Sequence, residues 1–356
     1  MDVTFWAGRR VLLTGHTGFK GAWAGRWLAT LGAEVTGISL APEPEPNLFA
    51  ALGSNHLVSS HIADLRDAEL TSRLVADADP DIVFHLAAQP LVRLSYAAPV
   101  LTFGSNVMGT VHLLDALRKH AKPQAIIIVT SDKVYENDGS GRAYREEDRL
   151  GGHDPYSASK AATEIAVASF RRAFFSEMGV PVVTARGGNV IGGGDFSVDR
   201  VIPDIVRALM AGRMPEIRNP KATRPWQHVL DCLDGYFTFA EALTRSAQQR
   251  IDLPLALNFG PLSNSPSVTV GALANRFLTT LGHPAFFDEI TANGPHEMAL
   301  LSIDPTLATR SLPWQPRLDS HQAIDLTAHW YSGFMAAKQM SALTDAQIDA
   351  FQRKTL

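Results

Sequence analysis

The chain of 356 residues has one cysteine, no long hydrophobic run and no strong excess of charge of either sign. The single cysteine, Cys232, excludes an internal disulfide bond and a metal site built from several cysteines, and we expect it to be a small core residue. The apolar run Val11–Leu13 is too short for a signal peptide, and no later run approaches the length of a membrane span. These absences predict a cytoplasmic protein with no metal and no membrane partner.

Basic and acidic residues nearly balance: 32 Lys and Arg against 36 Asp and Glu give a formal net charge of −4. This balance gives no overall attraction to nucleic acid or to a membrane surface, so neither is expected as a partner. A ligand that carries phosphate would have to be held by local cations or by helix N-termini. A chain of this length can bury one large core or two unequal ones.

Short β-branched runs alternate with longer helical patterns over the first two thirds of the chain, which is typical of βαβ units around a parallel sheet. We predict strands at Val11–Thr14, Glu34–Leu40, His56–Ile62, Ile82–Leu86, Ala125–Thr130, Val180–Ala185 and Ala256–Gly260. We predict helices at Gly21–Leu31, Val107–Lys119, Tyr156–Met178, Pro203–Ala211 and Val229–Thr244. The predicted fold class is α/β, a Rossmann doubly wound parallel sheet with a smaller mixed C-terminal lobe.

Three glycines spaced Gly-x-x-Gly-x-x-Gly follow the first predicted strand and open the first helix. Gly15 permits the tight turn, Gly18 lets the backbone approach a pyrophosphate, and Gly21 lets the helix pack closely on the strand. The helix N-terminus then offers free N–H groups and a partial positive charge to the phosphates. The turn predicts a dinucleotide site that also includes Thr17, Phe19 and Lys20.

The second predicted strand ends at Ser39-Leu40, without the acid that often binds the adenosine ribose in NAD enzymes. It also lacks an arginine for a 2′-phosphate, which favours NAD over NADP. Asp64, after the third strand, could accept a hydrogen bond from the adenine amino group, or it could be a solvated loop acid. The predicted cofactor site is completed by Leu65, Leu86, Ala87, Ala88, Gln89, Asn106 and Thr130.

Tyr156 and Lys160 form a Tyr-x-x-x-Lys pair, and this spacing puts both side chains on one helix face. A phenol starts from a pKa near 10, so it needs help to act as a base near neutral pH. An adjacent ammonium and a nicotinamide cation would both favour the phenolate. The pair therefore predicts oxidation of a substrate hydroxyl, and both residues would also contact the cofactor.

The fifth predicted strand ends in Ser131-Asp132-Lys133, at the carboxyl edge where ligand chemistry occurs in open α/β sheets. Ser131 could hydrogen-bond the hydroxyl being oxidised. Asp132 and Lys133 add an acid and a base, which a β-elimination demands: one group removes a proton beside a ketone and the other protonates the departing hydroxyl. The alternative is that Asp132 and Lys133 form a surface ion pair.

Other polar segments suggest a substrate pocket. His85 reads as a packing histidine rather than a catalyst, whereas Gln89, Leu91 and Val92 could line the pocket. Arg224 is our candidate for a diphosphate anchor, because a diphosphate favours bidentate arginine donors. An exposed basic loop is the alternative for the segment around Arg224.

Together these segments closely resemble the CDP-glucose 4,6-dehydratases, within the extended short-chain dehydrogenase superfamily. The likeness covers nearly the whole chain and rests on residues 15–21, 87–93, 105–111, 131–137, 152–157, 188–195 and 224–229. The Ser-Asp-Lys triplet is specific, since dTDP-glucose dehydratases have Asp-Glu at its last two positions and related 4-epimerases lack the acid/base pair. The chain reads Gly187 where the family usually has alanine, which could loosen the loop carrying Asn189.

The resemblance implies a reaction. Tyr156 takes the 4-hydroxyl proton of CDP-glucose while C4 is oxidised, and Lys160 holds the cofactor ribose. Lys133 then abstracts the C5 proton and Asp132 protonates the leaving 6-hydroxyl, which gives CDP-4-dehydro-6-deoxyglucose after C6 is reduced. The implied substrate-binding set is Gln89, Leu91, Val92, Ser131, Asn189, Arg200 and Arg224.

The predicted domain boundary lies after residue 187, where Gly192–Gly194 and several prolines interrupt the alternation of strand and helix patterns. We expect an NAD-binding Rossmann domain at 1–187 and a mainly sugar-nucleotide-binding lobe at 188–356, with about 229–262 returning to the Rossmann domain. The resemblance also implies a homo-dimer or homo-tetramer paired through the two long helices, and a product used in deoxysugars of a bacterial surface polysaccharide. The alternatives are a dehydratase or 4-epimerase for another nucleotide sugar, and a catalytically silent sensor.

Overall fold

A seven-stranded parallel sheet forms the centre of the computed structural model, which describes residues 1–54, 56–249, 252–261, 268–290 and 301–353. The strand order is β12-β7-β5-β4-β1-β2-β3, and every neighbouring pair is parallel. The strands are β1 (Arg10–Thr14), β2 (Glu34–Ser39), β3 (Ser59–Ile62), β4 (Ile82–His85), β5 (Ala125–Val129), β7 (Val182–Gly187) and β12 (Ala256–Phe259). The order reverses beside β1, so the predicted doubly wound Rossmann fold is confirmed.

Helices cover both faces of the sheet. Side chains that alternate along β1 divide between two cores: Val11 and Leu13 pack with α1 (Phe19–Thr30) and α10 (Val229–Gln249). Leu12 packs in the second core with α3 (Ala68–Ala78), α6 (Gly109–His120) and α7 (Pro155–Phe170). Burial on both faces explains why the strands read as continuous apolar runs.

A π-helical turn that the sequence pattern did not reveal overlaps the start of the predicted helix Val107–Lys119, and another lies within the predicted helix Tyr156–Met178. The turn η2 (Gly104–Met108) precedes α6, and η4 (Arg171–Phe175) lies between α7 and α8 (Ser176–Met178). Within η2, the Asn106 carbonyl accepts from the hydroxyls of Thr110 at 2.7 Å and Thr163 at 3.0 Å. These hydroxyls satisfy a carbonyl that leaves the regular helical ladder, so the bulge depends on a contact from α7.

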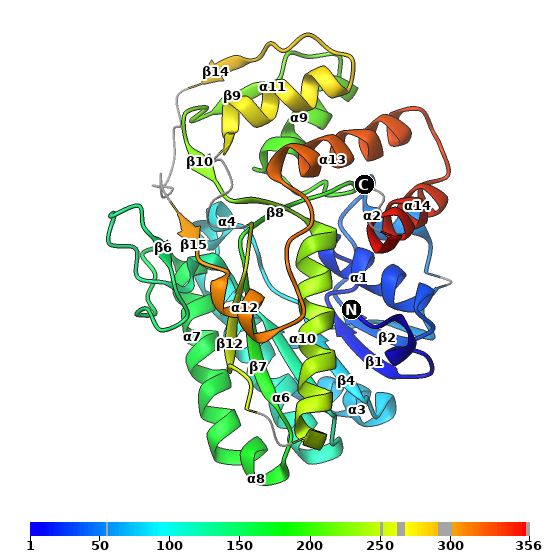
Figure 1. Cartoon of the computed structure of the whole chain (residues 1–356), viewed down its shortest axis with the longest axis vertical. Coiled ribbons are helices and arrows are strands. Elements are labelled where there is room, and N and C mark those ends of the chain that lie inside the picture. Colours follow the sequence, from blue (N-terminus) through cyan, green and yellow to red (C-terminus); the bar gives the residue numbers. More distant parts are fainter. Residues whose placement is uncertain (55, 250–251, 262–267, 291–300, 354–356) are drawn as a thin grey trace.

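The second lobe stands above the carboxyl edge of the sheet (Figure 1) and is built around α9 (Val201–Met210), α11 (Val270–Thr280) and α13 (Ser320–Met335). Short strand pairs flank it: β9 (Glu216–Arg218) with β14 (Asp288–Ile290), and β10 (Thr223–Arg224) with β13 (Val268–Thr269). A third pair, β8 (Asn189–Ile191) with β11 (Trp226–His228), leads from the sheet into this lobe. The remaining elements are η1 (Val3–Phe5), α2 (Leu48–Leu52), α4 (Val92–Ala97), α5 (Pro99–Phe103), η3 (Asp132–Val134), β6 (Ala143–Tyr144), β15 (Ser302–Ile303), α12 (Thr306–Ser311) and α14 (Met340–Arg353).

Segments from the second half of the chain return to the sheet. Helix α10 packs on β5, and β12 adds a strand beside β7. Residue 262, the end of the segment expected to return, lies outside the described residues. The division of the chain into domains at residue 187 stays a prediction. Across the ranges that the structure describes, no helix combines the length and apolar character that crossing a membrane requires.

The glycine run after β8 is a point of close packing. A Cβ atom on Gly193 would lie 1.9 Å from the indole of Trp330 on α13, and the Gly193 carbonyl accepts from Trp23 at 2.8 Å. These contacts join α1, β8 and α13 with no room for a side chain. The run that looked like an interruption in the sequence is therefore required by the packing between lobes.

We predict that Gly193→Ala lowers the free energy of unfolding by about 1–3 kcal/mol, because the added methyl overpacks a buried contact. The measurement is urea unfolding followed by tryptophan fluorescence. Gly104→Ala is the matched control, since its Cβ would meet only the Arg66 side chain at 3.5 Å. An unchanged midpoint for Gly193→Ala would contradict the packing account.

Candidate active site

The predicted catalytic and cofactor residues gather at the carboxyl ends of β1, β4, β5 and β7, which are four consecutive strands of the sheet. The turn after β1 carries the three glycines, and the segment after β4 carries Leu86, Ala87 and Ala88, all half-buried. The segment after β5 carries Thr130 and the Ser-Asp-Lys triplet. Ligands of open α/β sheets bind at such an edge, beside the reversal of strand order.

The glycine turn fits a dinucleotide phosphate. Gly15 has φ +77°, and a Cβ there would lie 2.7 Å from the Ala87 nitrogen; a Cβ on Gly21 would lie 2.0 Å from the Gly15 carbonyl oxygen. Gly18 is the exposed N-cap of α1 and supplies no side-chain cap. The first-turn N–H groups of α1, including those of Phe19 and Lys20, are therefore left to a ligand, as phosphate binding requires.

Two predicted cofactor residues already have protein partners. The Thr17 hydroxyl lies 2.7 Å from the Ser39 hydroxyl and donates to the Leu40 carbonyl at 2.9 Å, which ties the glycine turn to the end of β2. Asp64 forms an ion pair with Arg66, and hydrogen bonds from Arg66 lower the pKa of Asp64. Contact of Asp64 or the neighbouring buried Leu65 with adenine stays a prediction.

Asn106 holds the segment after β4 against α7. Its amide oxygen accepts from the Gln89 backbone at 2.7 Å, and its amide nitrogen donates to Ser159 at 2.8 Å. The Gln89 side chain donates to Thr102 at 2.8 Å and accepts from the Leu91 backbone. Gln89 thus uses its carboxamide inside the protein, and its predicted role in lining a sugar pocket is not evident in this geometry.

His85 is fully enclosed between two threonines. Its Nδ1 lies 2.7 Å from the Thr14 hydroxyl and its Nε2 lies 2.9 Å from the Thr110 hydroxyl. Burial lowers the pKa of His85 to about 3, so the ring is neutral near pH 7. This agrees with the reading of His85 as a packing residue.

Tyr156 and Lys160 lie at the start of α7. Asp154 caps this helix by accepting from the Ser157 backbone at 2.9 Å. Burial raises the pKa of Tyr156, against the lowering effect of Lys133 and of a hydrogen bond with Ser131. A further positive charge is therefore needed to favour the phenolate.

Lys160 is buried, and its ammonium donates to the Val129 carbonyl at 3.1 Å. Burial and the charge of Lys20 lower the pKa of Lys160 to about 7, against the opposing charge of Glu164. The carbonyl contact points Lys160 at the end of β5, beside the Ser-Asp-Lys triplet.

Asp132 and Lys133 begin the short turn η3, and Ser131 is its N-cap. Ser131 caps the turn by accepting from the Lys133 backbone at 3.2 Å, and its hydroxyl donates to Asp132 Oδ1 at 3.0 Å. Lys133 Nζ lies 3.2 Å from the same carboxylate oxygen. The Asp132 side chain is 1% exposed and that of Lys133 is 22% exposed, so this is not a surface ion pair.

Asp132 has one carboxylate oxygen, Oδ2, that is buried and has no hydrogen-bond partner in the described structure. This oxygen lies on the side of Gly188, where a Cβ would be 3.9 Å away. A buried carboxylate oxygen without a partner is costly, which fits a group that acts on a ligand.

The predicted substrate residues come from both lobes. Asn189 on β8 has a buried amide nitrogen without a protein partner among the described residues. Arg200 donates to Asp195 at 2.9 Å, and its charge acts on Tyr156. Leu91 and Val92 begin α4, which packs on α7, whereas Arg224 on β10 donates to the Thr223 carbonyl at 2.9 Å.

Sequence reasoning missed a buried ion pair behind the site. The Arg186 guanidinium donates from Nε and Nη2 to the Glu164 carboxylate at 2.9 Å each. Glu164 also accepts from Thr130 at 2.6 Å, and Arg186 donates to Tyr135 at 2.9 Å. The signal for Glu164 was present, because it follows Lys160 by four residues on the same face of α7.

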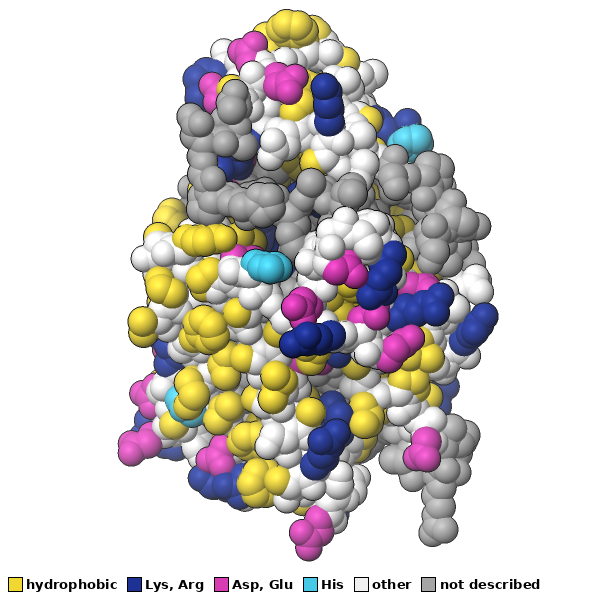
Figure 2. All heavy atoms as spheres, turned by 90° about the vertical axis from the view of Figure 1, so that its left-hand side faces the viewer, with side chains coloured by type: hydrophobic (Ala, Val, Ile, Leu, Met, Phe, Trp, Pro, Cys, Tyr) yellow, Lys and Arg dark blue, Asp and Glu magenta, His cyan; other side chains and the backbone are white. Residues whose placement is uncertain are grey.

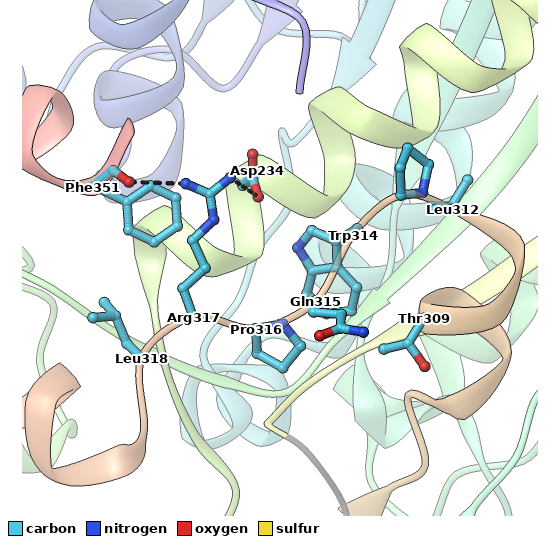
Figure 3. A pocket seen from close by; sticks show the side chains of 10 residues that line it. Asp234, Thr309, Leu312, Trp314, Gln315, Pro316, Arg317, Leu318 and Phe351 are labelled. Atoms are coloured by element: carbon cyan, nitrogen blue, oxygen red, sulfur yellow. Dashed lines mark hydrogen bonds and ion pairs between the residues drawn. The ribbon is translucent and has the colours of Figure 1, made fainter. Parts of the chain in front are cut away.

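A cavity of about 640 Å³ lies away from this chemistry (Figure 3). Its lining includes Asp234 of α10, Trp314 and Arg317, and Arg317 bridges Asp234 to the Phe351 carbonyl. Helical spacing places Asp234 on the face of α10 opposite Cys232, which faces the catalytic edge. The cavity is therefore separate from the candidate active site.

The fold and the site define a Rossmann-type enzyme that binds a dinucleotide and carries the Tyr-x-x-x-Lys pair of short-chain dehydrogenases, with an added acid and base. Residues 11–252 match the model of the NAD dependent epimerase/dehydratase family. The chain belongs to this family, and its cofactor is NAD.

Curated relatives cover the whole chain. It is 39% identical to a CDP-glucose 4,6-dehydratase of Salmonella typhimurium over 100% of this chain and 99% of the relative. It is 28% identical to a dTDP-glucose 4,6-dehydratase of Xanthomonas campestris pv. campestris over 90% of this chain and 92% of the relative.

Solved structures share the fold. A UDP-galactose 4-epimerase is 25% identical, with a TM-score of 0.70 over 90% of this chain and 97% of its own. An NAD-dependent NDP-hexosamine 5,6-dehydratase of tunicamycin biosynthesis is 22% identical, with a TM-score of 0.75 over 91% of this chain and 98% of its own. Both resemblances span the sheet and the second lobe.

Gly187 lies in regular β-structure, where it pairs with Phe259. A Cβ at Gly187 would lie 2.5 Å from the Tyr236 hydroxyl oxygen and 3.6 Å from Cys232 Sγ. The glycine therefore makes room for a tyrosine of α10. The expectation that it loosens the following loop is wrong for this chain, because the position is closely packed.

We predict that Gly187→Ala lowers the free energy of unfolding by about 1–3 kcal/mol. Adding Tyr236→Phe, which deletes the oxygen that the new methyl meets, should recover most of that loss. Thermal unfolding of the two single variants and the double variant closes the cycle. Additive effects of the two substitutions would rule out the proposed steric exchange.

Proposed function

We propose that the protein is an NAD-dependent dehydratase that converts CDP-D-glucose to CDP-4-dehydro-6-deoxy-D-glucose. The observation that carries this proposal is the buried Asp132 with Lys133 at 3.2 Å, beside the Tyr156–Lys160 pair. The full-length similarity to the Salmonella enzyme supports both the reaction and the nucleotide. The residue roles below are part of the proposal.

Oxidation at C4 uses Tyr156, Lys160 and Ser131. Ser131 orients the 4-hydroxyl, and Tyr156 receives its proton. Lys160 binds the ribose of the cofactor, and its positive charge favours the tyrosinate. When bound, NAD would supply the hydride acceptor for this oxidation and the hydride donor for the later reduction.

Elimination uses the neighbouring pair. The C4 ketone acidifies the C5–H bond, so that neutral Lys133 can take this proton while Asp132 protonates the departing 6-hydroxyl. The reactive form of the pair, neutral lysine with protonated aspartic acid, has the same number of protons as the ion pair in the structure. The two forms differ only by movement of one proton between side chains 3.2 Å apart.

Residues from the second lobe complete the proposed substrate site. Asn189 offers a free amide, while Arg200 and Arg224 are candidates for the diphosphate. Leu91, Val92 and the backbone at Gln89 are proposed to border the sugar. We place the enzyme in the cytoplasm and expect its product to enter deoxysugars of a surface polysaccharide such as the O-antigen.

An epimerase or a silent sensor would need no buried acid next to a lysine. A 4-epimerase returns the hydride to C4 and has no leaving group to protonate. A sensor would gain nothing from Ser131, Asp132, Lys133, Tyr156 and Lys160 together. A dehydratase for another nucleotide keeps all these groups, so nucleotide preference needs its own test.

We predict that the protein with NAD, incubated in deuterated water with CDP-glucose, dTDP-glucose, UDP-glucose or GDP-mannose, dehydrates CDP-glucose only. Mass spectrometry should show loss of one water and gain of one deuteron at C5. Asp132→Asn and Lys133→Met should each lower kcat by about 10²-fold or more, since each removes a proton-transfer group. No loss of water from any of the four sugars would overturn the dehydratase assignment, and turnover of another nucleotide would change only the substrate.

We further propose that two copies pair through the face formed by α4, α5 and α7 with η2 and η4. Figure 2 shows hydrophobic side chains gathered on the side of the molecule that carries α7. The exposed apolar residues of these elements are Leu94, Tyr96, Val100, Leu101, Phe103, Met108, Ile165 and Phe174. Helices α4 and α5 both pack on α7, so these side chains belong to one face. This face includes Ile165 and Phe174 of the predicted long helix Tyr156–Met178, whereas the predicted helix Val107–Lys119 contributes only Met108 among the described large apolar side chains that are exposed.

Substitution of Ile165, which is 63% exposed, by glutamate should break this pairing. Light scattering should then give the 38.6 kDa of one chain in place of a multiple of it. Phe286→Glu, at a residue 60% exposed in the second lobe, is the control and should leave the assembly intact. A wild-type protein of single-chain mass at working concentrations would rule out the pairing.

A further inference from the structure

The residues that follow the catalytic turn are anchored more firmly than their place in a loop suggests. Val134 and Tyr135, directly after Lys133, are 0% and 1% exposed. The Tyr135 hydroxyl donates to Asn258 of β12 at 2.6 Å and accepts from Arg186 of β7 at 2.9 Å. Burial raises the pKa of Tyr135, so the phenol keeps the proton that it donates.

Arg186 connects this anchor to the helix that carries Tyr156. Two of its nitrogens bind Glu164 on α7, and a third donates to Tyr135 and to the Glu146 carbonyl at 3.0 Å. Glu164 in turn accepts from Thr130, the residue before the Ser-Asp-Lys triplet. A closed chain of hydrogen bonds therefore runs from one side of the catalytic turn, through a buried ion pair, to the other side.

We propose that Tyr135 is a positioning residue that holds the Asp132–Lys133 pair in register with Tyr156. The inference rests on the proposed dehydration, in which one bound sugar must meet both groups in succession. Tyr156 serves C4, whereas Lys133 and Asp132 serve C5 and C6. The turn that carries Asp132 and Lys133 is fixed at its start by Ser131 and at its end by Tyr135. A backbone hydrogen bond from Gly151 to the Val134 carbonyl and the bridge between Tyr135 and Leu150 remain without the Tyr135 hydroxyl. Loss of that hydroxyl therefore shifts the turn by a small distance, which moves Lys133 and leaves Tyr156 in place.

The neighbouring Tyr144 provides a matched control. Its ring stacks on that of Tyr135, with centroids 5.3 Å apart and planes at 10°. The Tyr144 hydroxyl, however, bonds to the Asp138 region, accepting from the Asp138 backbone at 2.9 Å, and not to Arg186. Replacing either tyrosine by phenylalanine keeps the stacked rings, but only Tyr135→Phe cuts the link to Arg186 and Asn258.

The experiment compares Tyr135→Phe and Tyr144→Phe in the full chain with NAD and CDP-glucose. For Tyr135→Phe we expect kcat to fall by about tenfold or more with little change in KM, as a small displacement of a reacting group produces. Because oxidation is spared and elimination is slowed, the absorbance of reduced nicotinamide should accumulate during turnover. Tyr144→Phe should keep wild-type kcat and show no such accumulation.

Thermal unfolding of Tyr135→Phe and the pH dependence of its kcat separate a positioning role of Tyr135 from general loss of structure. A positioning role predicts a folded variant whose kcat depends on pH differently from that of the wild type. Equal kcat values for the wild type and Tyr135→Phe, or a loss without reduced nicotinamide, would overturn the inference. If Tyr135→Phe does not fold, Asn258→Ala is used, because it removes the acceptor of the Tyr135 hydroxyl and leaves the Arg186–Glu164 pair intact. The same accumulation is expected, and its absence counts against the proposal. Failure of the wild type to dehydrate any nucleotide sugar would instead overturn the proposed function.

Discussion

The ion pair between Arg186 and Glu164 is the interaction on which the geometry of the catalytic edge depends. Their side chains are 5% and 4% exposed, so both charges have lost nearly all their water. Desolvation costs several kcal/mol per ion and is offset only where the pair is bidentate and the remaining donors and acceptors are used. Here Thr130 and Thr184 bind the carboxylate, and Tyr135 binds the guanidinium. Removing either charge would leave the other buried and unpaired, at a cost of about 3–5 kcal/mol.

The gain from such a costly arrangement is geometric. Apolar side chains of similar volume could pack α7 on the sheet in more than one register, whereas hydrogen bonds of fixed length allow one. The pair joins β7 to α7 and, through Thr130, to the end of β5. Tyr156 and the Ser-Asp-Lys turn are thus set by the same contacts. Around them, Lys20, Lys133 and Arg200 supply positive charge that acts on Lys160 and Tyr156, although the whole chain has a formal net charge of −4.

The sheet was predictable because strands buried on both faces read as unbroken apolar runs, as in Ile126–Ile128 of β5. The glycine turn was predictable because each glycine meets a backbone limit within the same βα unit. Features that depend on distant residues were not predictable. The π turn at Asn106 depends on a hydrogen bond from Thr163 of α7, and a side chain at Gly187 would clash with Tyr236 of α10. The direction of the Gln89 side chain was missed for the same reason, since Thr102 provides its partner. Sequence alone identifies the types of groups at the site, but it does not show which of them are already hydrogen-bonded to other parts of the protein.

The proton balance of the proposed reaction suggests a second role for Ser131, between the oxidation at Tyr156 and the elimination at Asp132. Over one turnover Tyr156 gains the 4-hydroxyl proton, and Asp132 loses a proton to the departing water. Lys133 takes the C5 proton and delivers one back to C5, so it ends unchanged; its partial exposure permits exchange with solvent in between. The enzyme is restored when Tyr156 loses a proton and Asp132 gains one, either through solvent or by transfer between them. The Ser131 hydroxyl interacts with Tyr156 and donates to Asp132 at 3.0 Å, so the oxygen that is proposed to orient the substrate also connects these two groups.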